Sequence, residues 1–204
     1  MKSDNYPLLF AALTISMLIL SGICAVDKFT WVMEEFPTYV SLPILFFSYK
    51  KFKFTPLIYW IVLFHYFILA VGGTYTYAKV PFGFWMQDWF GFSRNHFDRI
   101  GHFLQGFVPA LIVRELLIRT SPLRPGKWLN YIVVAICLCN SAGYEFIEWW
   151  SSVSQGASAD AFLGTQGDPW DAQEDMFMCV IGAITALLAL SHYQNKLLLK
   201  FHHD

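Results

Sequence analysis

The sequence predicts an all-α membrane protein, a six-transmembrane-helix bundle that forms a single integral membrane domain over residues 1–204. Only 14% of the 204 residues are charged and 56% are hydrophobic, whereas an ordinary soluble domain carries about 25% charged residues. The apolar residues occur in long runs, and a helix needs about 20 of them to cross a bilayer. The expected spans are residues 7–26, 33–49, 55–73, 99–118, 128–149 and 174–193.

The first two spans need the most justification. Residues 7–26 are uncharged. This run is long for the apolar region of a signal peptide, which has about 7–15 residues, and no A-x-A cleavage site follows it. The second span is short and is interrupted by Pro37 and Pro43, with Glu34 and Glu35 at its mouth. We therefore expect a retained first span and an irregular second one.

The distribution of basic residues supports this count and sets an orientation. Lys50, Lys51 and Lys53 lie between spans two and three, and three further basic residues lie between spans four and five. Lys196 and Lys200 follow span six. With six spans all these groups fall on one side, which the positive-inside rule identifies as the cytoplasm. Both termini are then cytoplasmic.

Composition also restricts the partners. The formal net charge is −1, so nothing favours binding of nucleic acid, which requires a basic surface. The four cysteines all lie in apolar runs and are expected to behave as small buried hydrophobic residues. The lipid bilayer is the expected environment, and a lipid or cell-envelope molecule is a candidate ligand.

Polar clusters interrupt the ends of spans four, five and six. They are centred on the pairs Asp98 with His102, Glu145 with Glu148, and Asp171 with Asp175. The predicted topology puts all of them at the outer side of the membrane. Members of each pair are three or four residues apart and therefore share a helix face. Since ionisable groups at membrane depth are costly and usually functional, we expect one candidate site where these faces meet.

Several chemistries suit such a site. Clustered carboxylates repel one another unless something positive lies among them. Mixed carboxylate and imidazole ligands suit a divalent metal ion such as Zn, Mn or Fe. The candidate metal ligands are Asp98, His102, Glu145, Glu148, Asp171 and Asp175, and the candidate catalytic residues are Asp98, His102, Glu148 and Asp175.

Arg94 and Arg99 are basic exceptions on the outer side, which suggests a specific role. Guanidinium groups bind phosphate oxygens, so the candidate residues for binding a lipid headgroup are Arg94, Arg99, His96 and Asp168. The Ser-Arg motif of phosphatidic-acid phosphatases is not completed here, because Ile100 occupies the position of the catalytic histidine. A purely structural network, in which the arginines neutralise the acids, is the alternative.

Three functions remain open on these residues. The first is an envelope protein that binds or processes an amphipathic molecule, with or without metal. The second is a transporter or proton-coupled carrier that uses Glu145, Glu148 and His102. The third is a structural or interaction protein whose buried ion pairs fix helix packing. The residues do not decide whether the protein is an enzyme.

Two sequence motifs carry a resemblance to a known family. These are Gly83-Phe84-Trp85-Met86-Gln87-Asp88-Trp89 and Arg94-Asn95-His96-Phe97-Asp98-Arg99-Ile100-Gly101-His102. Together with Gly167-Asp168-Pro169-Trp170-Asp171, they resemble the YjdF family of bacterial inner-membrane proteins. The resemblance covers essentially the whole chain. It implies a multi-pass protein of the bacterial inner (plasma) membrane, and the family has no established biochemical function.

The last three spans also show a more distant similarity to VanZ-like membrane proteins. Asp98-Arg99-Ile100-Gly101-His102-Phe103 is similar to their Asp-Lys-x-x-His-Phe pattern. Later elements match at Glu148 and Asp175, while Ser151 and Cys179 replace the family's Gln and Asn. The similarity points to Asp98, His102, Glu148 and Asp175, and the two replacements put a shared ligand in doubt.

Overall fold

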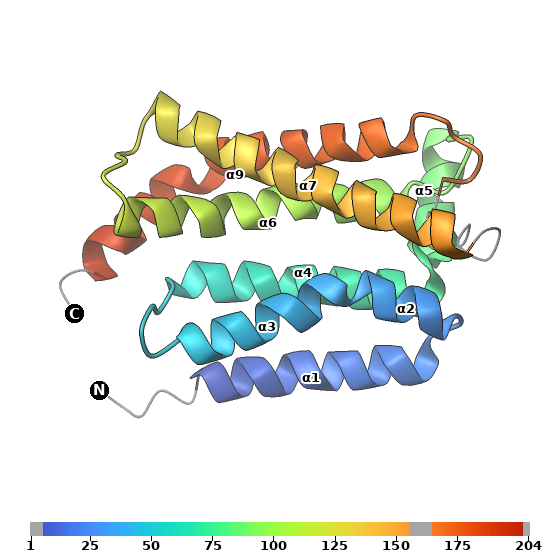
Figure 1. The fold of residues 1–204 in the computed structure, drawn as a ribbon, viewed down its shortest axis with the longest axis horizontal. Coiled ribbons are helices and arrows are strands. Elements are labelled where there is room, and N and C mark those ends of the chain that lie inside the picture. Colours follow the sequence, from blue (N-terminus) through green and yellow to red (C-terminus); the bar gives the residue numbers. More distant parts are fainter. Residues whose placement is uncertain (1–5, 156–164, 202–204) are drawn as a thin grey trace. The chain divides into compact units, whose positions relative to one another are not determined.

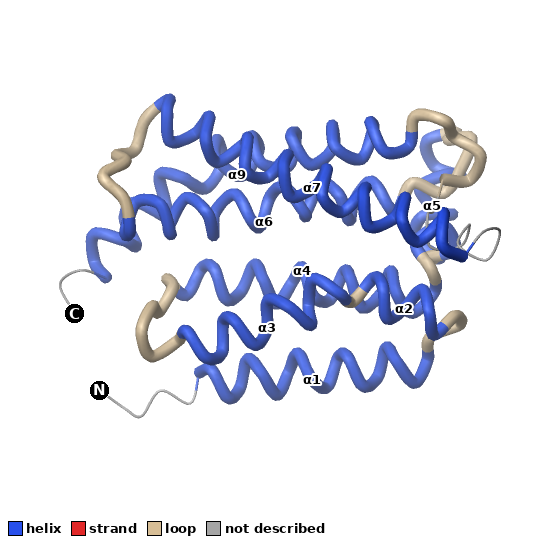
Figure 2. Tube along the Cα trace, in the orientation of Figure 1, coloured by secondary structure: helices blue, strands red, loops and turns tan. Residues whose placement is uncertain are grey.

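The computed structural model describes residues 6–155 and 165–201, and the regular elements in these residues are all helices (Figures 1 and 2). The chain forms two compact units, Met1–Phe97 and Asp98–Asp204. The elements are α1 (Tyr6–Cys24), α2 (Lys28–Glu34), α3 (Phe36–Ser48), α4 (Pro56–Tyr75), η1 (Tyr77–Lys79), α5 (Pro81–Phe90), α6 (Phe97–Thr120), α7 (Lys127–Gln155) and α9 (Asp171–Phe201).

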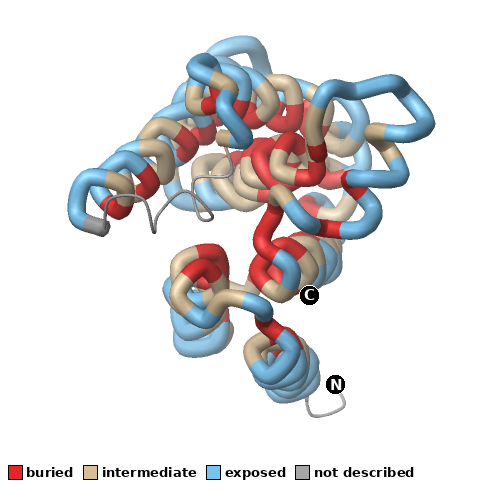
Figure 3. The backbone as a smooth tube through the Cα atoms, turned by 90° about the vertical axis from the view of Figure 1, so that its right-hand side faces the viewer, coloured by how far each residue is buried: buried red, intermediate tan, exposed pale blue. Residues whose placement is uncertain are grey.

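Five helices of the described residues are long and apolar enough to cross a membrane, namely α1, α4, α6, α7 and α9. The shortest, α1, has 19 residues, which corresponds to about 29 Å at 1.5 Å per residue. Most of α1 is exposed, as the pale blue helix nearest the label N in Figure 3 shows. Exposed leucine and isoleucine side chains are expected where a helix faces lipid. The prediction of an all-helical membrane protein is confirmed, whereas the count of six spans stays a prediction.

The second expected span differs from one uninterrupted helix over residues 33–49. The structure has α2 and α3 instead, with Glu35 between them. The Glu35 N–H donates to the Trp31 carbonyl at 3.0 Å, and the Tyr39 N–H donates to the Glu35 carbonyl at 3.0 Å. Helical hydrogen bonding therefore continues across the junction. Pro37 has no N–H to donate, so one helical hydrogen bond is missing there. This interrupts the helix between α2 and α3, while the two segments remain joined end to end.

In the first unit, α4 contacts both α1 and α2. Trp31 of α2 packs against glycines on both neighbours: a Cβ atom on Gly22 of α1 would lie 2.8 Å from the indole, and one on Gly73 of α4 would lie 3.1 Å from it. The indole N–H also donates to Ser21 Oγ at 3.0 Å. The two glycines thus admit a large ring where the three helices meet.

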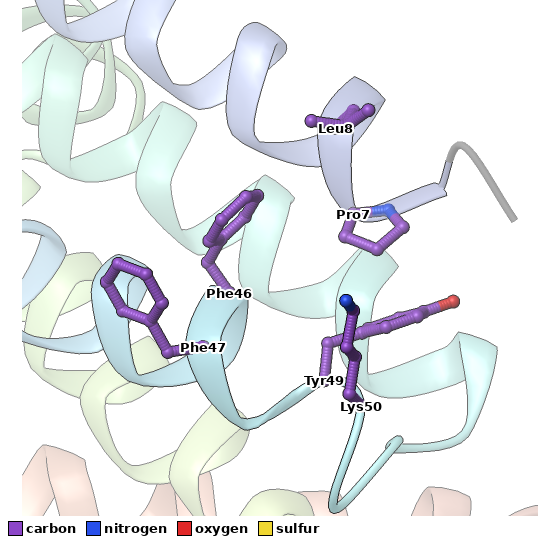
Figure 4. Close-up of a pocket in the computed structure, with 6 residues that line it drawn as sticks. All are labelled: Pro7, Leu8, Phe46, Phe47, Tyr49 and Lys50. Carbon is purple, nitrogen blue, oxygen red and sulfur yellow. The ribbon is translucent and has the colours of Figure 1, made fainter.

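A groove between α1 and the end of α3 belongs to this unit (Figure 4). It encloses about 610 Å³ and is lined by Pro7, Leu8, Phe46, Phe47, Tyr49 and Lys50. Phe46 and Phe47 project from α3, and Leu8 and Pro7 lie across from them on α1. The lining has one charged side chain, that of Lys50, and no carboxylate, imidazole or thiol, so it lacks the usual metal ligands.

In the second unit, α6 and α9 approach at reciprocal glycines. A Cβ atom on Gly106 would overlap the Cys179 carbonyl oxygen, and a Cβ atom on Gly182 would overlap the Phe103 carbonyl oxygen. Close backbone approach at small residues is a common way for membrane helices to pack. The Cys179 thiol lies 3.5 Å from the Cys137 carbonyl oxygen of α7, so the same level of α9 also contacts α7. This packing fixes the ends of the three helices relative to one another.

Candidate functional site

The polar side chains of the second unit gather at one end of α6, α7 and α9. Asp98, Arg99 and His102 lie in the first turns of α6, and Glu145 and Glu148 lie in the last third of α7. Asp171, Glu174 and Asp175 lie in the first turns of α9. Acidic residues are favourable in the first turn of a helix because they face its free N–H groups. The acidic residues therefore favour helix formation at the starts of α6 and α9. Packing then brings the last part of α7 beside these two helix starts.

Arg99 organises one half of this cluster. Its guanidinium donates hydrogen bonds to Asp175, to Asp171 Oδ1 at 2.9 Å and to Glu174 Oε2 at 2.7 Å. The Asp168 carboxylate lies 3.8 Å from the same guanidinium. The Arg99 side chain is 10% exposed and that of Asp175 is 1% exposed. One buried cation thus holds carboxylates from the start of α9 and from the turn before it.

His102 organises the other half. Its Nε2 lies 3.5 Å from Asp98 Oδ1 and 3.7 Å from Asp175 Oδ1. Its Nδ1 lies 3.9 Å from Glu145 Oε1. The ring is stacked edge-on to Tyr144, with the centroids 6.3 Å apart. Asp175 is shared by both halves, since it also accepts from Arg99.

A second layer of polar groups orients the imidazole. The Gln105 Oε1 atom lies 2.8 Å from His102 Nδ1 and accepts from Ser141 Oγ at 3.3 Å. A carbonyl oxygen cannot donate, so Nδ1 carries the proton in this hydrogen bond and Nε2 faces the carboxylates. Sequence reasoning did not identify Gln105 or Ser141. The available signal was Gln105 itself, a polar residue one turn after His102 in an apolar run.

Glu145 lacks full compensation. Its Oε1 atom is buried and has no hydrogen-bond partner, and the side chain is only 10% exposed. Glu148, one turn further along α7, is 8% exposed and shares a helix face with Glu145. Two neighbouring carboxylates repel one another unless a proton or another cation lies between them. A buried acceptor without a donor is costly. The described residues supply no donor for Glu145 Oε1, so a proton or a bound ion is needed to compensate this atom.

The ion pairs divide the carboxylates between the two cationic side chains. Arg99 lies against those of Asp168, Asp171, Glu174 and Asp175. The His102 ring lies near those of Asp98, Glu145 and Asp175. An imidazole is a weaker counter-charge than a guanidinium, because it is charged only when protonated, so the group around His102 is the part of the cluster best suited to take up a proton or a cation.

The atoms around His102 have a spacing that a metal ion can use. One ligand atom each from Asp98, His102 and Asp175 lies within 4.8 Å of the other two. The distances of 3.5 and 3.7 Å from Nε2 to the two carboxylates are close to the separation of about 3.3 Å that tetrahedral bonds of about 2.0 Å to zinc produce. The histidine tautomer set by Gln105 also leaves Nε2 free to bind a metal in the neutral ring.

Most of the expected site residues meet in this cluster. Those from the second unit are Asp98, Arg99, His102, Glu145, Glu148, Asp168, Asp171 and Asp175. Arg94 and His96 belong to the first unit, where the His96 ring packs edge-on to Phe92 at 4.9 Å. Their role in binding a substrate stays a prediction. Glu174, which was not among the expected site residues, binds Arg99.

A separate polar network lies at the opposite ends of α6 and α9. Arg114 is 2% exposed and donates to Gln194 Oε1 at 2.9 Å and to Asn195 Oδ1 at 2.6 Å. Arg119 forms a 3.0 Å ion pair with Glu115 one turn away. The amide of Gln194 also donates to the Leu111 carbonyl at 2.8 Å. Both arginines of this network donate to side chains of the protein, although the buried Arg114 Nε atom has no hydrogen-bond partner among the described residues.

Five long apolar helices in the described part of the chain, three of which bring buried acids and a histidine together at one end, define a polytopic membrane protein. The chain belongs to the family described as "Predicted membrane protein (DUF2238)", whose model matches residues 6–196. It is 46% identical over 192 residues to "Inner membrane protein YjdF" of Escherichia coli (strain K12), covering 94% of this chain and 92% of that protein. No solved structure matches the chain. The expected family is thus confirmed, and the protein is a multi-pass inner-membrane protein.

Proposed function

We propose that the group around His102 binds a divalent metal ion, and that the ion binds the polar head of an amphipathic envelope molecule. Asp98, His102 and Asp175 supply three ligands. The observation that carries the proposal is that one ligand atom from each of these residues lies within 4.8 Å of the other two. The buried Glu145 Oε1, 3.9 Å from His102 Nδ1, adds a negative charge next to this group. Mixed oxygen and imidazole ligands favour Zn, Mn or Fe over Mg or Ca.

Arg99 and Glu148 have different roles in this proposal. Arg99 holds Asp175 from the side that faces Asp171 and Glu174, so it orients a ligand and offsets excess negative charge. Glu148 adjoins Glu145 and accepts or supplies a proton when the bound molecule reacts or leaves. Asp98, His102, Glu148 and Asp175 are therefore the residues through which any chemistry proceeds.

The proposed topology places this site on the extracytoplasmic side. It has six spans, with α2 and α3 together forming the second, and both termini in the cytoplasm. The support is the position of Lys50, Lys51 and Lys53 and of the basic residues after α6 and α9, which all fall on one side in this arrangement. Fusions of a periplasm-active reporter after Gly167 should be active and fusions after Pro125 inactive. The reverse pattern excludes the orientation.

Metal content tests the function. The protein is purified in mild detergent without chelator, incubated with Zn²⁺, Mn²⁺ or Fe²⁺, desalted and analysed for metal. We expect about one ion per wild-type chain, and loss of that ion in Asp98→Asn and His102→Ala. Glu174→Gln is the matched control, because Glu174 contacts Arg99 and not His102, and it should retain the ion. A folded wild-type protein that retains none of these metals excludes the proposal.

A proton-coupled carrier is the second candidate, favoured by the buried Glu145 and Glu148, which are one helical turn apart on α7. In that case protons, rather than a metal ion, compensate the carboxylates. The expected signature is pH-dependent flux in proteoliposomes that Glu148→Gln abolishes, together with absence of bound metal. Retention of one ion per chain with no such flux favours the metal site.

A further inference from the structure

A second acidic residue without compensation lies in the first unit, at the junction of α2 and α3. Glu35 is fully buried, and neither of its carboxylate oxygens has a hydrogen-bond partner. Thr38, three residues further along α3, is also fully buried, and its hydroxyl has no partner either. Residues three apart share a helix face. The junction thus presents three buried oxygen atoms whose hydrogen bonds are not made within the protein.

The surroundings offer no counter-charge. No salt bridge to Glu35 is found among residues 6–155 and 165–201, and the side chains that its charge affects are the phenols of Tyr39 and Tyr66. The Tyr66 hydroxyl is 2.6 Å from Ser41 Oγ, so it already has a partner. Lys28, the nearest lysine in sequence, is directed to the end of α1, where it donates to the Gly22 and Ala25 carbonyls at 2.5 and 3.1 Å.

An ionised carboxylate in this position is very unfavourable. Burying a charge without a partner costs more than burying any other group, and such a group becomes neutral instead. Within a membrane protein, ionisable residues of this kind commonly carry protons. Either a proton or a metal cation therefore compensates Glu35.

The backbone hydrogen bonds at the junction favour a proton over a metal cation. Metal ions such as Ca²⁺ and Mg²⁺ take six or more oxygen ligands, and broken membrane helices usually provide them as free carbonyls. Here the Trp31 carbonyl already accepts from Glu35 N–H, and the Glu35 carbonyl accepts from Tyr39 N–H, both at 3.0 Å. With these two carbonyls engaged, the oxygen atoms shown to lack partners are the three side-chain ones. They are fewer than the six or more ligands that such an ion takes, and they are sufficient to hold one proton.

We propose that Glu35 is an exchangeable proton-binding site, in which the protonated carboxyl group donates a hydrogen bond to the Thr38 hydroxyl. The bond places the proton at the kink between α2 and α3, where Pro37 has already weakened the helical hydrogen bonding. The other ionisable side chains around the junction are Glu34 of α2, Tyr39 of α3, and His65 and Tyr66 of α4. The site is independent of the cluster around His102, and its ligand is a proton and not a divalent ion.

A lipid-soluble carbodiimide tests the proposal, because it reacts with protonated carboxyl groups in apolar surroundings. Dicyclohexylcarbodiimide is added to membranes containing the full chain, and the adduct on Glu35 is measured by mass spectrometry. We expect the adduct at pH 6, at least a fivefold loss of it at pH 9, and no change when Na⁺ replaces choline at constant ionic strength. Glu34→Gln is the neighbouring control and should retain the adduct on Glu35.

Three results overturn the proposal: no adduct on Glu35 at either pH, equal labelling at pH 6 and pH 9, or protection by Na⁺. A second measurement does not depend on access of the reagent. Glu35→Gln mimics the protonated side chain, so its unfolding temperature should be close to that of the wild type at pH 4, below the ordinary pKa of a carboxyl group, and exceed it at pH 9. In the proposal the folded state binds the Glu35 proton more tightly than the unfolded state, so stability falls more between these two pH values in the wild type than in the variant. Identical pH dependence of the two proteins contradicts the proposal.

Discussion

The Arg99 guanidinium of α6 donates a hydrogen bond to the Asp175 carboxylate of α9, across a sequence separation of 76 residues. Both side chains are buried, and Asp175 lies at the same time 3.7 Å from His102 Nε2. Asp175 therefore connects the carboxylates that Arg99 binds with the group around His102. The ion pairs of Arg99 stabilise the helix ends, whereas the proposed metal site involves the group around His102.

Arg99→Ala should strongly destabilise the second unit. The substitution leaves Asp171 and Asp175 without their donor, and removing one partner of a buried ion pair costs about 3–5 kcal/mol. Thermal unfolding in detergent should show a large fall in the unfolding temperature. Arg124→Ala is the control, since Arg124 is exposed, and it should change little. Partial recovery in the double variant Arg99→Ala with Asp175→Asn tests the cause, because the second substitution removes the uncompensated charge.

Glu145→Gln should separate stability from metal binding. In the presence of a chelator the variant should be as stable as the wild type or more so, because the amide is neutral and can donate where the buried Oε1 has no partner. Its metal affinity should fall, since a negative charge beside the ligand His102 is lost. The measurements are the unfolding temperature in chelator and a metal titration. Lower stability in chelator contradicts the view that Glu145 lacks compensation within the protein.

Gly106→Ala and Gly182→Ala should disrupt the contact between α6 and α9. In each case the new Cβ would overlap a backbone carbonyl oxygen of the other helix, and a backbone cannot move away as a flexible side chain can. Gly143→Ala in α7 is a matched control because a Cβ there has no atom within 4 Å, and Ala should stabilise the helix by about 1 kcal/mol. Folded yield and unfolding temperature should fall for the first two variants only. An equal response of all three contradicts the close approach.

Much of the site could be predicted because its signals are local in sequence. Asp98 and His102, or Asp171 and Asp175, are one helical turn apart, so their shared face follows from helix geometry alone. The distribution of lysines and arginines then assigns these pairs to the same end of three helices. These arguments grouped the acids with His102. They did not show that the carboxylates bound by Arg99 are those at the start of α9 and in the turn before it. Which side chains of α6 face α9 depends on the rotation of α6 about its axis, and the glycine contacts with α9 determine this rotation.

Other features had no comparable signal. The junction at Glu35 depends on how one proline interrupts a run that otherwise keeps its helical hydrogen bonds, and a count of apolar residues does not reveal this. The contact of Gln105 with Ser141 joins two helices, so neither residue alone indicates it. The similarity of the last three spans to VanZ-like proteins stays a prediction. The structure shows only that Cys179 lies in the tight packing of α9 on α6 and α7.

Gln105→Leu should weaken metal binding without removing any ligand. Gln105 Oε1 accepts the Nδ1 proton of His102 at 2.8 Å, and this bond fixes the ring and leaves Nε2 facing Asp98 and Asp175. Loss of such an outer hydrogen bond typically lowers metal affinity by 10–100-fold. A competition titration with a chromophoric chelator should show a weaker dissociation constant with the stoichiometry unchanged at saturating metal. Gln105→Glu, which keeps an acceptor at the same position, should restore affinity, and a purely structural role predicts no such recovery. Ser141→Ala should have a smaller effect, because the 3.3 Å bond from Ser141 supports Gln105 and not His102 directly.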